Sequence, residues 1–393
     1  MTTSPGPGLA LMFSGGGARA AYQVGFLRLL AREFPDVVPD ILTGVSAGGI
    51  NAAYLAAREE PFAEKVEDLA DVWAGLRIDN VFKVDLRNLT SRTLRWGGRL
   101  LGGGTHPLPP ARSLVDTAPL REMLEAVLLA REDGELPGIQ RNLDAGWLRA
   151  IALTASSYTT GQSVTWLQTR PACGIQTWER PYRKSVACTF TVNHVMATSS
   201  LPFFFPAVEI EGAWYGDGGI RLTEPLAPAV HLGARKIIAV STRYGRSREE
   251  ADRPAIINYP PPAQVAGVLY NAIFLDQLDG DALQLHQINR LIAKLPPDQR
   301  EGFRPIDLFM LRPSIDLGLL ANEHEPELPR AFRFMTRGLG TRETRSNDML
   351  SLMMFQKDYI KRLMDLGEED ATARIPEIRR FLAAGVATEN TEA

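Results

Sequence analysis

The sequence predicts an α/β fold with a mainly parallel central sheet, because strands and helices alternate from the start of the chain. The apolar run Leu9 to Phe13 ends at a glycine turn, and residues 18–33 then carry apolar side chains at helical spacing. A second unit follows, with a strand at 41–45 and an alanine-rich helix at 47–57. Alternation of this kind is typical of a sheet with helices on both faces, which makes three layers.

The later sequence divides into two regions. Residues 8–245 continue the alternation and form the expected catalytic domain, and residues 260–385 form a mainly helical extension that we expect to pack on it. Further strands are predicted at 148–153, 163–168, 207–210, 236–241 and 306–311, and long helices at 264–295 and 346–366. Gly367 is the expected residue just past the end of the second long helix.

Composition excludes several classes of protein. The chain has 393 residues, 45% hydrophobic and 23% charged, as in globular proteins. A net charge of −3 gives no overall attraction to nucleic acid, so we expect no such partner. Cys173 and Cys188 are too few for a disulfide framework or a cysteine zinc site. We expect no metal and no cofactor.

No signal peptide and no membrane-spanning segment is predicted. The first residues lack a basic region followed by a long apolar core, and no window approaches the ~20 apolar residues of a spanning helix. We therefore expect a cytoplasmic protein whose membrane contact is at most peripheral. The oligomeric state is left open.

Residues 80–112 are a basic insertion in the first region. They hold six basic side chains against the single acid Asp85. On a helical wheel, residues 86–101 separate leucines and Trp96 from four arginines. Two interpretations follow: a lid that packs its apolar face on the sheet domain, which we favour, or a helix that lies in an anionic membrane surface.

The motif Gly44-Val45-Ser46-Ala47-Gly48 is the strongest signal for chemistry. It stands between a predicted strand and a predicted helix, which is the context that a nucleophile elbow requires. Small residues at 44 and 48 allow the sharp turn that exposes the serine hydroxyl at a helix N-terminus. We predict that Ser46 is the nucleophile of an acyl transfer.

Such a nucleophile needs hydrogen-bond donors for the oxyanion of its tetrahedral intermediate. Gly15, Gly16 and Gly17 follow the first strand and offer unhindered backbone N–H groups. Neighbouring parallel strands place their loops at the same carboxyl edge of the sheet, so this loop is expected to face Ser46. Arg19 is expected to add positive charge there.

The general base is expected to be Asp217 rather than a histidine. None of the five histidines stands in a loop of catalytic character: His106, His194, His231, His286 and His324. Asp217 lies in Tyr215-Gly216-Asp217-Gly218-Gly219, where glycines allow close approach of another loop. Partial burial raises the pKa of an aspartate toward the range of a useful base. An ordinary Asp-Gly turn is the alternative interpretation.

Together, Ser14 to Arg19, Gly44 to Gly48 and Asp217 to Gly219 resemble the patatin-like phospholipases. The segment Thr198-Ser199-Ser200-Leu201-Pro202 is also similar, and the resemblance covers about residues 8 to 242. It implies a three-layer α/β/α fold, a Ser46–Asp217 dyad, an oxyanion hole in the first glycine loop and metal-independent cleavage of carboxylic esters in phospholipids or lysophospholipids. Ser14 and Ala20 depart from the family pattern, in which aspartate and glycine are common.

Two alternative functions are open at this stage. The spacing of Gly15, Gly17 and Ala20, with Asp36 further on, also fits a dinucleotide-binding fingerprint and an oxidoreductase. A lipid-binding or regulatory protein without turnover is the other alternative. The sequence does not identify the acyl ester or the role of the helical extension.

Overall fold

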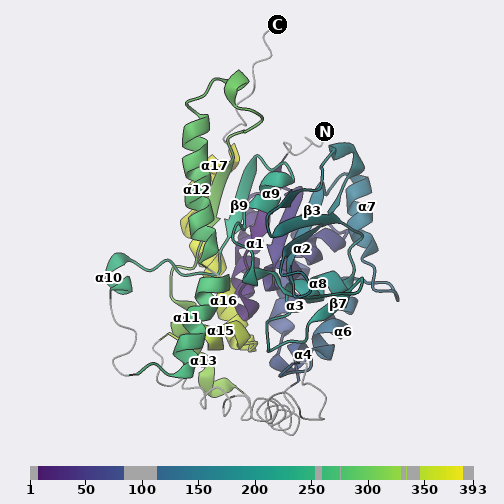
Figure 1. The fold of residues 1–393 in the computed structure, drawn as a ribbon. Helices are drawn as coiled ribbons and strands as arrows, with labels where there is room; N and C mark the ends of the chain where they lie inside the picture. Colours follow the sequence, from purple (N-terminus) through teal and green to yellow (C-terminus); the bar gives the residue numbers. More distant parts are fainter. Residues whose placement is uncertain are drawn as a thin grey trace.

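The computed structural model describes residues 8–83, 113–252, 259–274, 276–328, 333 and 346–383, in which one sheet is flanked by helices (Figure 1). The basic insertion from residue 84 to 112, with the segment 86–101, lies outside these residues. The strands are β1 (Leu9–Phe13), β2 (Ile41–Val45), β3 (Ala150–Ser157), β4 (Ser163–Thr169), β5 (Glu179–Arg180), β6 (Arg183–Ala187), β7 (Val208–Ile210), β8 (Ala213–Asp217), β9 (Lys236–Val240) and β10 (Asp307–Leu311).

The order of the strands places the first two units at the centre of the sheet. Within the described residues it runs β10-β9-β1-β2-β3-β4-β6-β5, with β8 on β3 and β7 on β8. The five strands from β10 to β3 are parallel. Since Phe13 pairs with Gly44, the turns after β1 and β2 meet at one edge. The α/β fold with a mostly parallel sheet is confirmed.

The sheet departs from the expected parallel pattern beyond β3. Strand β4 pairs antiparallel with β3, as does β8. The connection between β3 and β4 is only residues 158–162, and a parallel crossover needs a dozen or more residues. A hairpin is therefore the only connection that this segment can make.

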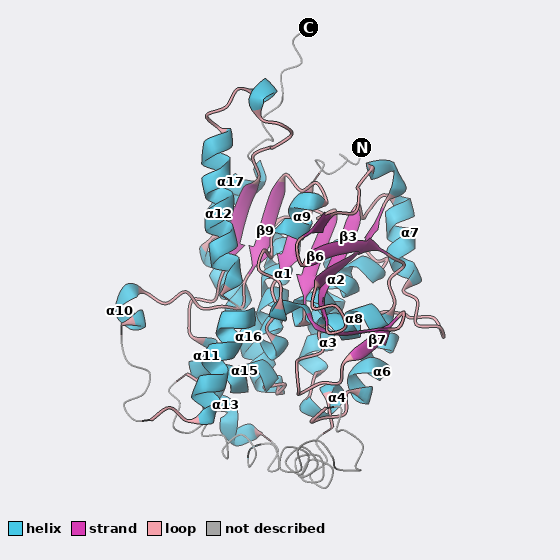
Figure 2. Ribbon diagram, viewed as in Figure 1, coloured by secondary structure: helices cyan, strands magenta, loops and turns pink. Residues whose placement is uncertain are grey.

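Helices cover both faces of the sheet (Figure 2). One face is packed by α1, α2, α3 and α16, and the other by α9 and α12. The helices used below are α1 (Ala21–Glu33), α2 (Ala47–Ala57), α3 (Phe62–Gly75), α4 (Ile78–Val81), α6 (Ala118–Val127), α7 (Pro137–Ala145), α8 (Val192–Thr198), α9 (Ala227–His231), α10 (Arg248–Ala251), α11 (Pro262–Phe274), α12 (Gln277–Ile292), α13 (Leu317–His324), α15 (Asp348–Met353), α16 (Lys357–Ala373) and α17 (Ile375–Ala383).

The C-terminal region is joined closely to the rest of the chain. Strand β10 extends the sheet beside β9, and α16 packs along α1. A Cβ at Gly367 would lie 2.0 Å from the carbonyl oxygen of Tyr22, so glycine permits this helix contact. The expectation that Gly367 ends a helix is therefore wrong, because it lies inside α16.

Both long helices predicted in this region are divided. Residues 264–295 contain α11 and α12, and residues 346–366 contain α15 and the first part of α16. Helical spacing of apolar residues continues across both divisions, so it gave no sign of them. The second division lets Phe355 reach a pocket beside Ser46.

Candidate active site

Ser46 stands at a strained turn between β2 and α2. Its φ of 56° and ψ of −136° are rare for a residue with a side chain. A Cβ at Gly48 would lie 2.3 Å from the carbonyl oxygen of Ser14, and one at Gly44 would lie 2.5 Å from the carbonyl oxygen of Gly48. Glycine is required at both positions because the turn passes against the first glycine loop.

Thr198, at the end of α8, holds the Ser46 backbone in place. The N–H of Ser46 donates to the carbonyl oxygen and to Oγ1 of Thr198, both at 3.1 Å. The same Thr198 hydroxyl donates to the carbonyl oxygen of Thr154 on β3 at 2.5 Å. Sequence reasoning missed this role, although Thr198 opens the segment Thr198 to Pro202 that resembles the family.

Asp217 ends β8 and is completely buried. Its Oδ1 accepts a hydrogen bond from the N–H of Gly219 at 2.9 Å. Its Oδ2 is buried without a hydrogen-bond partner among the described residues. An unpaired buried oxygen of this kind is rare and is often found where a group must react.

Burial raises the pKa of Asp217 to about 7, although the Ser46 hydroxyl and the Gly219 N–H partly oppose this rise. Ser46 therefore approaches the carboxylate closely enough to affect its charge. The two side chains do not make a hydrogen bond of full geometry, since Oδ2 has no partner. We read the contact as a close approach.

Helix α11 covers Asp217 from the C-terminal region. A Cβ at Gly219 would lie 2.2 Å from the ring of Phe274, so this glycine lets α11 approach. Burial, with the nearby charge of Asp217, raises the pKa of Tyr158 and of Tyr270 to about 12. Apolar and aromatic groups thus exclude water from the carboxylate.

The first glycine loop lies directly against Ser46. A Cβ at Gly15 would lie 3.1 Å from Cβ of Ser46. The N–H groups of Gly15 and Gly16 donate no hydrogen bond to another described residue. Gly17 has a φ of 53°, and a Cβ there would lie 2.1 Å from the carbonyl oxygen of Leu352 on α15. The loop is therefore packed between the elbow and the C-terminal region.

Arg19 points away from the place where an oxyanion would form. Its buried guanidinium donates to Ser351 Oγ at 2.6 Å and to Asp348 Oδ1 at 2.7 Å, both on α15. The expectation that Arg19 adds free positive charge to the oxyanion hole must be corrected, because the charge is neutralised by Asp348. Arg19 instead holds the glycine loop to α15.

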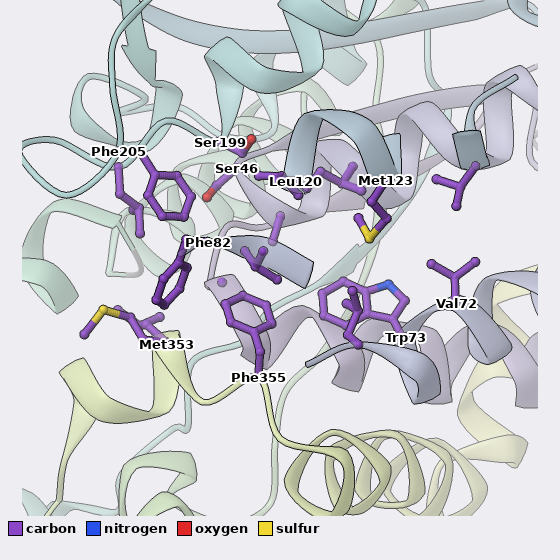
Figure 3. A pocket seen from close by; sticks show the side chains of 18 of the residues that line it. Ser46, Val72, Trp73, Phe82, Leu120, Met123, Ser199, Phe205, Met353 and Phe355 are labelled. Carbon is purple, nitrogen blue, oxygen red and sulfur yellow. The ribbon is translucent and has the colours of Figure 1, made fainter. Parts of the chain in front are cut away.

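An apolar pocket begins at Ser46 (Figure 3). It contains about 720 Å³ of space free of atoms, part of it open to solvent. Figure 3 shows it extending from Ser46 past Phe82 and Phe355 toward Trp73 and Met123. Its lining is almost entirely apolar, from α2, α3, α4, α6, α8, α15 and the loops after them: Gly17, Ser46, Ala47, Ile50, Tyr54, Leu69, Val72, Trp73, Leu76, Val81, Phe82, Leu120, Met123, Val127, Ser199, Leu201, Phe205, Leu352, Met353 and Phe355.

The other candidate residues lie elsewhere. The described histidines are absent from the pocket lining, and His194 is buried between Trp166 and Phe190, with its pKa lowered to about 4 by burial. His106 lies outside the described residues. Asp36 precedes β2, at the sheet edge opposite the glycine loop, so it does not reach a dinucleotide ribose beside that loop.

Two searches of the described residues found no feature. No group of three or more histidine, cysteine, aspartate or glutamate side chains is arranged to hold a metal ion in that part of the chain. No helix there is long and apolar enough to cross a membrane.

The model of the patatin-like phospholipase family matches residues 11–230, more than half of the chain. The chain belongs to the patatin-like phospholipase family. The resemblance seen in the motifs is thereby confirmed, and membership supports a lipid-hydrolase function. The matched segment contains Ser46 and Asp217 but ends before α11 and α15.

Solved structures similar to the chain include three phospholipase or effector structures. Human GIVD cytosolic phospholipase A2 is 12% identical, with a TM-score of 0.47 and coverage of 96% of this chain and 60% of that chain. VipD from Legionella pneumophila is 12% identical, with a TM-score of 0.34 and coverage of 92% and 67%. ExoU from Pseudomonas aeruginosa, in complex with SpcU, is 16% identical, with a TM-score of 0.28 and coverage of 96% and 78%.

The chain spans 59–67% of the length of the first similar structures. No curated protein sequence matches it.

Proposed function

We propose that this chain hydrolyses carboxylic esters of phospholipids or lysophospholipids through a Ser46–Asp217 dyad and an acyl-enzyme. The observation that carries the proposal is the buried Asp217 carboxylate, whose Oδ2 has no described partner and whose pKa is affected by the Ser46 hydroxyl. Family membership supports the reaction class.

In the proposed reaction, Asp217 accepts the proton of the Ser46 hydroxyl as Oγ attacks the ester carbonyl. The N–H groups of Gly15 and Gly16, with that of Gly17, stabilise the oxyanion. The ester C–O bond then breaks, and the alcohol leaves with the proton that Asp217 had accepted. Water, deprotonated by Asp217, attacks the acyl-enzyme and releases the fatty acid. A base with a pKa near 7 is suited to both steps.

The acyl chain of the substrate occupies the pocket beside Ser46. An almost wholly apolar lining offers an alkyl chain contacts that it cannot offer to a charged head group. Even the ring nitrogen of Trp73 is turned to another partner, since it donates to Asn51 Oδ1 at 2.8 Å. The polar part of the lipid therefore stays outside, in peripheral contact with a membrane surface.

The proposal is tested by fatty-acid release from a panel of phospholipids and lysophospholipids. Ser46→Ala and Asp217→Asn are each expected to reduce release by at least ~10³-fold while the fold is retained. Ser199→Ala is the matched control, because Ser199 lines the same pocket but its hydroxyl donates to the carbonyl oxygen of Val195 at 2.9 Å. Undiminished release by purified Ser46→Ala would overturn the proposal.

A further inference from the structure

Helix α11 has an unusual distribution of polarity. It contains no charged residue between Pro262 and Phe274. Its solvent side carries Val265, Val268, Leu269 and Ile273, of which Val268 is 57% and Leu269 is 55% exposed. A helix at the surface of a globular protein normally turns charged and polar side chains to water. Here the apolar side is turned outward.

The inner side of α11 fixes this orientation. Asn271 is buried and donates to Asp348 Oδ2 at 2.5 Å, and Gly267 lies against the Asp348 side chain. Phe274 packs on Gly219 beside Asp217. Figure 1 shows α11 next to α15, in agreement with these contacts. The outward face is therefore held in place by the same elements that build the candidate active site.

We infer that the outward face of α11, formed by Val265, Val268, Leu269 and Ile273, docks on a lipid bilayer. Contiguous exposed apolar side chains mark surfaces that bind a membrane or another protein. The bilayer is the favoured occupant because α11 covers Asp217, so docking there brings the site to the surface that contains its esters. This choice of occupant rests on the proposed function.

The absence of charge in α11 predicts the kind of membrane. A basic amphipathic helix binds anionic lipid and is released by salt. An uncharged face instead contributes buried apolar area, which neutral lipid accepts equally well. Tyr259, just before α11, is 92% exposed, and its ring combines an apolar body with a polar hydroxyl suited to the interface. Docking through α11 is therefore independent of lipid charge and of salt.

The test is flotation of the full chain with phosphatidylcholine vesicles, in a Ser46→Ala background that leaves the lipid intact. Val268→Ser/Leu269→Ser is expected to reduce the bound fraction constant at least tenfold, at low and high salt alike. Leu283→Ser/Leu291→Ser is the matched control, because these α12 leucines are 60% and 62% exposed and belong to another helix. Circular dichroism checks the fold, and Leu269→Ser alone is the milder variant.

Three results would overturn the inference: no flotation of the parent protein with neutral vesicles, equal flotation of the α11 variant, or equal losses in both double variants. Loss of a dimer in the α11 variant with unchanged flotation would assign the face to a second copy of the chain. Hydrolysis of a water-soluble short-chain ester, with Ser46 restored, is measured separately. Failure there contradicts the proposed function, whereas flotation alone decides the docking face.

Discussion

Arg19 and Asp348 form an ion pair of 2.7 Å between residues that are 329 positions apart. Arg19 follows the first glycine loop, whereas Asp348 begins α15, outside the segment that the family model matches. The pair is largely buried, and Asn271 of α11 also donates to the Asp348 carboxylate. The C-terminal region thus helps to hold the loop to which we assign the oxyanion.

Asp348→Ala is expected to destabilise the fold by about 3–5 kcal/mol, because it leaves the Arg19 guanidinium buried without its partner. The free energy of unfolding in urea measures the effect. Asp279→Ala is the control: Asp279 pairs with Arg312 at the same 2.7 Å but its side chain is 46% exposed, so the expected loss is below ~1 kcal/mol. Similar losses in the two variants would contradict a structural role for the buried pair.

Gly17→Ala is expected to lower ester hydrolysis by at least ~10-fold and to destabilise the fold by at least ~1 kcal/mol. The reason is the φ of 53° at Gly17 and the Leu352 carbonyl oxygen that a Cβ would meet at 2.1 Å. Gly280→Ala in α12 is the comparison, since a Cβ there has no neighbour within 4 Å and favours the helix by about 0.5–1 kcal/mol. Normal hydrolysis by Gly17→Ala would show that the loop does not bind the oxyanion.

Local sequence was sufficient to predict the centre of the fold. Strands β1 and β2 are short apolar runs that end at glycine-rich turns, and those turns need glycine because backbone atoms approach closely at Gly48 and Gly17. Such steric requirements leave a mark at the position itself. The assignment of Asp217 rested likewise on flanking glycines, with the family resemblance.

Contacts between distant segments were not predictable. Nothing near Arg19 shows that Asp348 is its partner, and nothing near Ser46 shows that Thr198 receives its N–H. The pocket residues from α3 and α6, such as Trp73 and Met123, have the spacing of ordinary core positions. Their role depends on which helices the fold brings beside Ser46, which periodicity alone does not determine.

Asp217→Asn is expected to stabilise the fold at pH 8 by about 1–4 kcal/mol while it removes activity. An unfolded aspartate loses its proton near pH 3.9, whereas burial raises the pKa of Asp217 to about 7. Between these values the folded state binds the proton more tightly, so stability falls as the pH rises from about 4 to about 7. The neutral asparagine lacks this loss.

Urea unfolding at pH 4 and pH 8 measures this difference. The two proteins are expected to be nearly equal in stability at pH 4 and to diverge by pH 8. An Asp217→Asn variant that is less stable than the parent at pH 8 would contradict the burial of an ionised carboxylate.

Met123→Trp is expected to shorten the acyl chain that the pocket accepts. Met123 lies away from Ser46 along the pocket, so a larger side chain there fills the space for the distal carbons (Figure 3). Hydrolysis of a series of esters of increasing chain length measures the change. Cleavage of short esters is retained and cleavage of long ones falls at least ~10-fold, at about 0.8 kcal/mol for each displaced CH₂. An unchanged preference would place the acyl chain elsewhere.

The most direct test of the dyad is covalent labelling by a fluorophosphonate that reacts with activated serine hydroxyls, located by peptide mass spectrometry. The expected result is one adduct on Ser46, formed faster as the pH rises through about 7, where Asp217 loses its proton, and strongly slowed in Asp217→Asn. An adduct on another residue, or labelling of Ser46 at the same rate with asparagine at 217, would contradict the account.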